Sequence, residues 1–102
     1  MSFQRWGYTV EGCWTSPNNL EQRSGVYIIW CGNDKPSNVL DVGESSDVLN
    51  RVLNHERAEC WKRNCIGSIW YSAIYTPNKQ QSGRIAIEET IRKIENPPCG
   101  ER

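Results

Sequence analysis

The chain has 102 residues, which is enough for one domain with a single modest core and too few for two. Twelve basic residues balance twelve acidic ones, which disfavours a protein that grips nucleic acid through a general excess of positive charge. No apolar run approaches the roughly 20 residues that span a bilayer, and residues 1–6 contain no apolar signal-peptide core. We therefore expect no membrane partner and a cytoplasmic location.

Five cysteines are scattered along the chain. An odd count without a secretion signal favours free thiols in a reducing compartment. No Cys-x-x-Cys pair supports a zinc site, so buried small side chains are the favoured interpretation. The cysteines are Cys13, Cys31, Cys60, Cys65 and Cys99.

Residues 1–23 are polar with isolated aromatic anchors, and we expect them to form an irregular amino-terminal flap. The β-branched and aromatic run 25–31 predicts a central strand, because both of its faces are apolar. Turn-forming residues follow, and 38–43 then predict a second strand. The two strands are expected to pair as an antiparallel hairpin.

A helix is expected next, with Ser45 or Ser46 as its N-cap and Asp47 in its first turn. Arg51 and His55 lie off the apolar stripe of this helix, four residues apart, which would place them on one helical face. His55 is the chain's only histidine. The polar stretch 56–63 either continues this helix or begins a short new one.

Residues 67–75 predict a third strand, and a helix over 82–95 follows it. A Pro-Pro pair after residue 96 ends that helix. The order of elements predicts a small α+β fold, a three-stranded antiparallel sheet flanked by helices, as one domain over residues 1–102. The expected buried line of the last helix is Ile87, Ile91 and Ile94.

Four features then occur in order along these elements. Gly25-Val-Tyr27 lies on the first strand and Asp41-Val-Gly43 on the second. Arg51 follows Gly43 by eight residues, and His55 comes four later. The last helix carries Ile-Glu-x-x-Ile-Arg over 87–92, with Asn-Pro-Pro-Cys-Gly after it. Together they resemble the GIY-YIG nuclease domain family, over roughly residues 24–98.

The resemblance implies hydrolysis of phosphodiester bonds in DNA with one divalent metal, Mg²⁺ or Mn²⁺. Carried over residue by residue, Glu88 would bind the metal, and Arg51 would contact the equatorial phosphate oxygens. Tyr27 would orient or deprotonate the attacking water, and His55 would transfer a proton or contact the phosphate. An unperturbed phenol pKa of about 10 makes Tyr27 a poor base at neutral pH unless a cation such as Arg51 lowers it.

Helix geometry separates two neighbouring carboxylates. At about 100° per residue, Glu88 flanks the buried isoleucine line, whereas Glu89 lies about 200° from Ile87 and faces solvent. A carboxylate at the rim of a packed face can line a cleft, so Glu88 is the better candidate ligand.

The chain departs from the family pattern at Asp41, where a second tyrosine is typical. Asp41 faces away from Leu40 and Val42. Three roles are open for it: a solvated carboxylate, a second anionic metal ligand, or a structural or water-ordering group, which we favour.

Each candidate residue also has an ordinary interpretation. Arg51 and His55 would be surface side chains, Tyr27 a core residue, and Glu88 a solvated charge paired with Arg84 or Arg92. The alternative function is a non-catalytic module that binds nucleic acid or protein and retains the fold. The neutral net charge and the missing tyrosine favour it. With either function, a local basic surface or a protein partner would have to supply affinity for DNA, because the net charge is zero.

Overall fold

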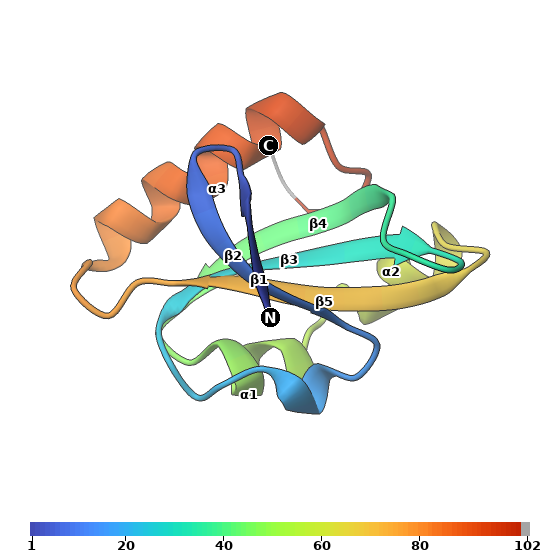
Figure 1. Ribbon diagram of the computed structural model, residues 1–102, viewed down its shortest axis with the longest axis horizontal. Coiled ribbons are helices and arrows are strands. Elements are labelled where there is room, and N and C mark those ends of the chain that lie inside the picture. The colour runs from blue at the N-terminus through green and yellow to red at the C-terminus, as the bar shows by residue number, and fades with distance from the viewer. Residues whose placement is uncertain (101–102) are drawn as a thin grey trace.

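A five-stranded antiparallel sheet organises the protein, and helices cover both of its faces (Figure 1). The structure is a computed structural model that describes residues 1–100. The last two residues of the expected domain therefore lie outside the described part. In chain order the elements are β1 (Ser2–Arg5), β2 (Tyr8–Trp14), the 3₁₀ helix η1 (Pro17–Asn19), β3 (Gly25–Gly32), β4 (Asn38–Ser45), α1 (Val48–Leu53), α2 (Ala58–Arg63), β5 (Ser68–Tyr75) and α3 (Gln81–Glu95).

The prediction of a three-stranded sheet was wrong. The sheet has five strands in the order β1-β2-β5-β3-β4. The two additional strands come from the segment that was expected to be an irregular flap, and β2 pairs directly with β5. The fold remains small and α+β, but the amino-terminal residues are part of its sheet.

A two-residue turn at Trp6 and Gly7 explains why this hairpin escaped recognition. Both residues have positive φ, 55° and 85°, as a tight hairpin turn requires, and such turns ordinarily carry Asn or Gly at the first position. Trp6 is held there by packing. Its ring stacks on Trp30 at 5.8 Å, and its Nε1 donates to Glu95 at 2.7 Å.

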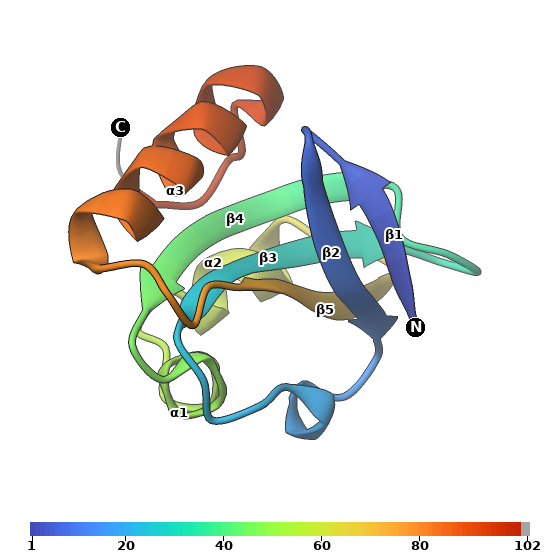
Figure 2. The ribbon, with the colours of Figure 1, turned by 60° about the vertical axis from the view of Figure 1, so that its left-hand side comes forward.

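The central strand β3 is buried along its whole length, as its two apolar faces predicted. Its side chains alternate between two cores. Tyr27 and Ile29 join the core beneath α1 and α2, whereas Ile28 and Trp30 join the core beneath α3 and the β1–β2 hairpin. Figure 2 shows the hairpin and α3 on one side of the sheet and α1 on the other.

The helix after β4 is shorter than predicted. Asp47, not Ser45 or Ser46, is its N-cap, accepting a hydrogen bond from the amide of Asn50. The helix ends at Leu53, so His55 lies in the connection to α2 and does not share a helical face with Arg51. The expectation that these two residues sit side by side on one helix was therefore wrong.

The last helix has the predicted position, and α3 packs against β4. Ile87 and Ile91 are buried, but Ile94 is 60% exposed and does not belong to the buried line. None of the helices within residues 1–100 is both long and apolar enough to cross a membrane.

Two disulfides correct the expectation of free thiols. Cys31 pairs with Cys65, and Cys60 pairs with Cys99, at sequence separations of 34 and 39. Among the described residues, Cys13 alone retains a free thiol. The four paired sulfurs are therefore unavailable as zinc ligands in this structure.

Candidate functional site

The phenol of Tyr27 occupies space that only a glycine leaves open. Tyr27 on β3 faces Gly43 on β4 as its direct cross-strand partner. A Cβ atom at position 43 would lie 2.0 Å from the Tyr27 hydroxyl and 2.2 Å from its Cζ. The two glycine-containing triplets noted in the sequence therefore meet across the sheet, and Gly43 is required for the position of the phenol.

The hydroxyl of Tyr27 lies against the imidazole of His55. Tyr27 Oη and His55 Nε2 are 2.5 Å apart, and both residues are buried. On the other side of the ring, Nδ1 accepts a hydrogen bond from the backbone N–H of Arg57 at 3.1 Å. A neutral imidazole carries one hydrogen, so we assign it to Nε2, which donates to the phenol oxygen.

Burial shifts the pKa values of both partners away from neutrality. Desolvation raises the pKa of Tyr27 to about 12, although the positive charges of Arg57 and Arg51 oppose the shift. Desolvation lowers the pKa of His55 to about 4, and the same two arginines add to that shift. At neutral pH the pair is therefore a neutral imidazole and a protonated phenol.

Arg51 lies near this pair but is engaged by a carboxylate. Its Nη1 and Nη2 donate to the two oxygens of Glu56 at 2.7 and 2.9 Å. The ion pair lowers the pKa of Glu56 to about 2. Arg51 would have to exchange this partner in order to contact a phosphate.

Asp41 is the centre of a buried cluster of charges and is completely shielded from solvent. Its carboxylate accepts hydrogen bonds from Arg57 Nε at 2.8 Å and Arg57 Nη2 at 3.2 Å. Trp61 Nε1 donates at 2.8 Å, and Arg92 Nη2 donates at 2.7 Å. These contacts make Asp41 a structural group that ties α2 and α3 to β4, and they leave it neither solvated nor available as a metal ligand.

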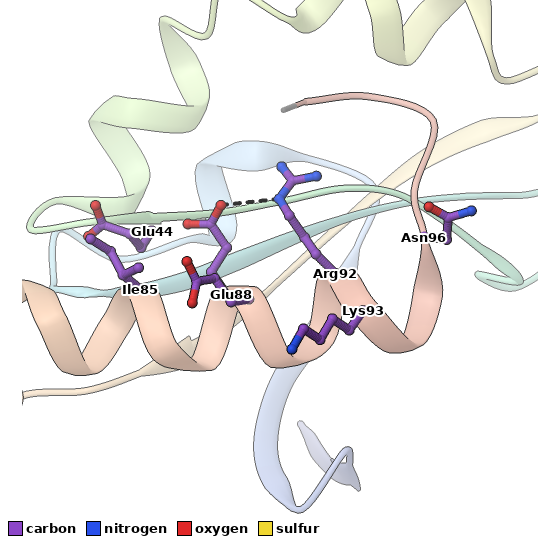
Figure 3. Close-up of a pocket in the computed structure, with 7 residues that line it drawn as sticks. Glu44, Ile85, Glu88, Arg92, Lys93 and Asn96 are labelled. Atoms are coloured by element: carbon purple, nitrogen blue, oxygen red, sulfur yellow. Dashed lines mark hydrogen bonds and ion pairs between the residues drawn. The ribbon is translucent and has the colours of Figure 1, made fainter. Parts of the chain in front are cut away.

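Glu88 lies in an open groove along α3, as its helical position predicted. Figure 3 shows Glu88 and Arg92 turned toward one another, and Arg92 Nε donates to Glu88 Oε2 at 3.1 Å. Within residues 1–100 no hydrogen bond reaches the other carboxylate oxygen, Oε1. Burial raises the pKa of Glu88, and the neighbouring Arg92 opposes that shift. By contrast, Glu89 is exposed.

The groove continues from α3 to the segment that precedes α2. A cavity of about 610 Å³ is lined by Glu88 and Arg92 on one side and by Glu56 and Arg57 on the other. A second cavity of about 790 Å³ extends along α3 from Glu88 (Figure 3). Glu88 is thus the carboxylate that both cavities share with Arg92.

The donor set fits one type of metal. The described residues contain no group of three or more His, Cys, Asp or Glu that could hold an ion. Mg²⁺ is commonly bound by one or two carboxylates, with waters and substrate phosphates completing its coordination. A half-buried Glu88 with one unbonded oxygen suits that arrangement, and an ion would favour the ionised form that burial disfavours.

Of the four residues singled out in the sequence, the structure brings Tyr27 and His55 into contact. Arg51 and Glu88 lie close enough for their charges to act on the pKa of Tyr27, but neither bonds to it. The sequence interpretation missed Arg57, Trp61 and Arg92 as partners of Asp41. A glycine within an apolar strand was the available signal for close packing at position 43, whereas no pattern marked the three donors.

Comparison of the chain with protein-family models, with curated proteins and with solved structures finds no match.

Proposed function

We propose that this protein is a metal-dependent endonuclease of the GIY-YIG type that hydrolyses phosphodiester bonds in DNA. The observation that carries the proposal is the contact of Tyr27 with His55 above Gly43. Each of these residues was selected from the sequence for this chemistry, and they are distant along the chain. Arg51, Arg57 and Glu88 lie close enough to the phenol for their charges to act on its pKa.

Glu88 is the residue that would hold Mg²⁺ or Mn²⁺. When bound, such an ion supplies positive charge to the phosphate and to the leaving oxygen. Side chains of the protein would bind the phosphate and transfer the proton. The groove between Glu88 and Arg57 would receive the phosphodiester, and the positive charge of its arginines would attract the phosphate.

Tyr27 would receive the proton of the attacking water only after losing its own. Nε2 of His55 donates to the phenol oxygen, so the imidazole stabilises a phenolate and does not accept its proton in this tautomer. A pKa of about 12 leaves the phenol protonated at neutral pH. The cleavage rate should therefore increase with pH through the neutral and alkaline range.

A charge-removing variant of Glu88 tests the proposal. Glu88→Gln retains an oxygen for Arg92 Nε but lacks the negative charge that binds a cation. Metal stabilisation is worth several kcal/mol, so we expect cleavage to fall at least about a hundredfold. The assay would use branched, single-stranded and duplex DNA with Mg²⁺, Mn²⁺ or chelator.

Glu89→Gln is the matched control, because Glu89 has the same chemistry but is exposed and does not line the cavity that contains Arg57. It should cleave as the wild type does. Equal cleavage by the Glu88→Gln variant, or no cleavage by the wild type under any of these conditions, would remove the nuclease assignment.

The second candidate is a non-catalytic module that binds nucleic acid or protein. Its support is that the charges around the site already neutralise one another: Arg51 pairs with Glu56, and Arg92 pairs with Asp41 and Glu88. A Mg²⁺ titration followed by NMR separates the two functions. Shifts of the amides around Glu88 support the nuclease, and their absence supports the module.

A cytoplasmic location also stays a prediction. Disulfides are typical of oxidising compartments, and the structure contains two of them. A count of free thiols in protein isolated without reductant would decide whether the cysteines are paired.

A further inference from the structure

Arg57 is bound to Asp41 by one edge of its guanidinium. Its Nε and Nη2 both donate to the buried carboxylate. Its remaining nitrogen, Nη1, makes no hydrogen bond within residues 1–100 and lies 3.7 Å from Glu56 Oε2. A quarter of the side chain is exposed, and it lines the groove opposite Glu88.

The other two arginines of the site have both terminal nitrogens engaged. Arg92 Nη1 donates to the carbonyl of Cys99, and its Nη2 donates to Asp41 and to the carbonyl of Val42. Both terminal nitrogens of Arg51 donate to Glu56. Arg57 is therefore the one arginine of the three that faces the groove with a terminal nitrogen still available.

Arg57 is also close to the Tyr27–His55 pair. Its own backbone N–H orients the imidazole through Nδ1. Of the positive charges near Tyr27, that of Arg57 opposes the rise in the pKa of the phenol most strongly, ahead of that of Arg51. An anion at Nη1 would therefore lie in the cavity that Glu88 also lines.

We propose that Nη1 of Arg57 contacts a non-bridging oxygen of a phosphodiester in this groove, and that Asp41 is the positioning residue that holds the guanidinium there. This assignment rests on the proposed function, since it names the group that receives the substrate phosphate. It gives Arg57 the role that the sequence pattern assigned to Arg51. It also accounts for an aspartate at position 41, because a carboxylate binds the Nε edge of arginine and leaves the far nitrogen free.

DNA binding, measured separately from cleavage, tests the assignment. Fluorescence anisotropy of a labelled single-stranded oligonucleotide, with Ca²⁺ in place of Mg²⁺, reports affinity without turnover. Replacing Arg57 by Gln should weaken binding about tenfold, because a charge-assisted contact is lost. It should also reduce the slope of log K against log salt by about 0.7, the value for one phosphate contact on a single strand.

Arg63→Gln is the matched control, since Arg63 is an exposed arginine at the other end of α2. It should change affinity less than about twofold and leave the slope nearly unchanged, because an exposed charge outside the groove makes no phosphate contact. Arg57→Lys guards against misfolding of the glutamine variant: it keeps a positive charge near Asp41 but loses the two-edged guanidinium, and it should also bind more weakly than wild type.

Asp41→Asn tests the positioning role. If Asp41 acts through Arg57, the variant should lose the same part of the salt slope, and the double variant Asp41→Asn/Arg57→Gln should bind no more weakly than Arg57→Gln alone. Additive losses in the double variant would overturn the positioning role, because Asp41 would then act independently.

The results separate this inference from the proposed function. Wild-type cleavage together with unaltered binding by both Arg57 variants would overturn the role of Arg57 and leave the nuclease intact. Arg57-dependent binding by a wild type that cleaves nothing would support the phosphate contact and remove the nuclease. A wild type that binds no DNA would overturn both.

Discussion

Replacing Gly43 by alanine should displace the phenol of Tyr27 and uncouple it from His55. The new Cβ would lie 2.0 Å from the hydroxyl, whereas ordinary contacts begin near 3.4 Å. The hydroxyl must therefore retreat by about 1.4 Å, and the 2.5 Å contact with His55 cannot survive that movement. Tyr27 is 1% exposed, so its ring has no free space to enter without shifting a neighbour.

The size of the effect follows from two opposing terms. Overpacking a closed core costs about 1–3 kcal/mol. Gly43 has no positive φ, so alanine meets no backbone strain and restricts the unfolded chain, which contributes about 0.4–1 kcal/mol in favour of the fold. Because the close approach involves two ring atoms, we expect a net loss of about 2 kcal/mol, or roughly 10 °C in the melting temperature.

Urea denaturation measures the stability, and the NMR titration of the single histidine measures the site. The pKa of His55 should rise from about 4 toward its ordinary value as the ring becomes hydrated. Gly83→Ala serves as the control: its Cβ would meet only the flexible Lys79 side chain at 3.3 Å, and it lies within α3. That variant should gain up to about 1 kcal/mol. A Gly43→Ala protein with wild-type stability and an unchanged His55 pKa would refute the packing argument.

Two further predictions concern pH and oxidation. The pKa of His55 is lower in the folded than in the unfolded chain, so below pH 6.5 the unfolded state takes up a proton that the folded state does not. The free energy of unfolding should therefore fall by about 3 kcal/mol as the pH is lowered from 6.5 to about 4. His55→Gln should lack this component in urea titrations at each pH; an unchanged pH dependence would show that other groups cause it. In denatured protein prepared without reductant, a thiol assay should find one reactive group, Cys13, and five after reduction. By limiting the entropy of the unfolded chain, each disulfide contributes about 4 kcal/mol to the free energy of unfolding, so reduction should also lower the melting temperature. Five reactive thiols before reduction would instead support the expectation from the sequence that all cysteines are free.

The sequence predicted an element correctly where its local pattern of apolar residues matches the burial found in the structure. The run 25–31 predicted a strand covered on both faces because its apolar residues are continuous, and β3 is buried on both sides. The 3.6-residue period placed Glu88 at a rim and Glu89 in solvent, and the structure agrees at both positions. The third isoleucine of the expected line, Ile94, is exposed, and it is Glu95 that contacts Arg5 and Trp6 of the β1–β2 hairpin.

The missing strands show what local pattern did not specify. Phe3, Tyr8 and Val10 alternate with polar residues, which is typical of a half-buried hairpin. The turn between the strands carries Trp6 where asparagine or glycine is expected, and its stability comes from Trp30 and Glu95, more than 20 and 80 residues away. A contact between residues so distant overrides turn propensity and cannot be read from a window of sequence.

The same limit applies to the site. Spacing in the chain suggested that Arg51 and His55 are neighbours, but the Asp47 cap and the end of α1 at Leu53 send His55 inward to Tyr27. The partners of Asp41 come from two helices that begin about 17 and 40 residues after it, and their charges alone gave no sign of burial. The cysteine pairing was equally inaccessible, because an odd count without paired spacing does not define connectivity.

The disulfide between Cys60 and Cys99 makes the buried cluster of charges around Asp41 sensitive to reduction. Cys60 precedes Trp61 in the chain, and the carbonyl of Cys99 accepts a hydrogen bond from Arg92. The disulfide therefore constrains Trp61 and Arg92, two of the three residues that bind Asp41. Reduction of this disulfide by glutathione would break the covalent link without changing the charge of Asp41 or of its partners. Trp61 and Arg92 would then hold Asp41 from less constrained segments, so the redox state of the compartment would affect how firmly these two side chains fix the carboxylate.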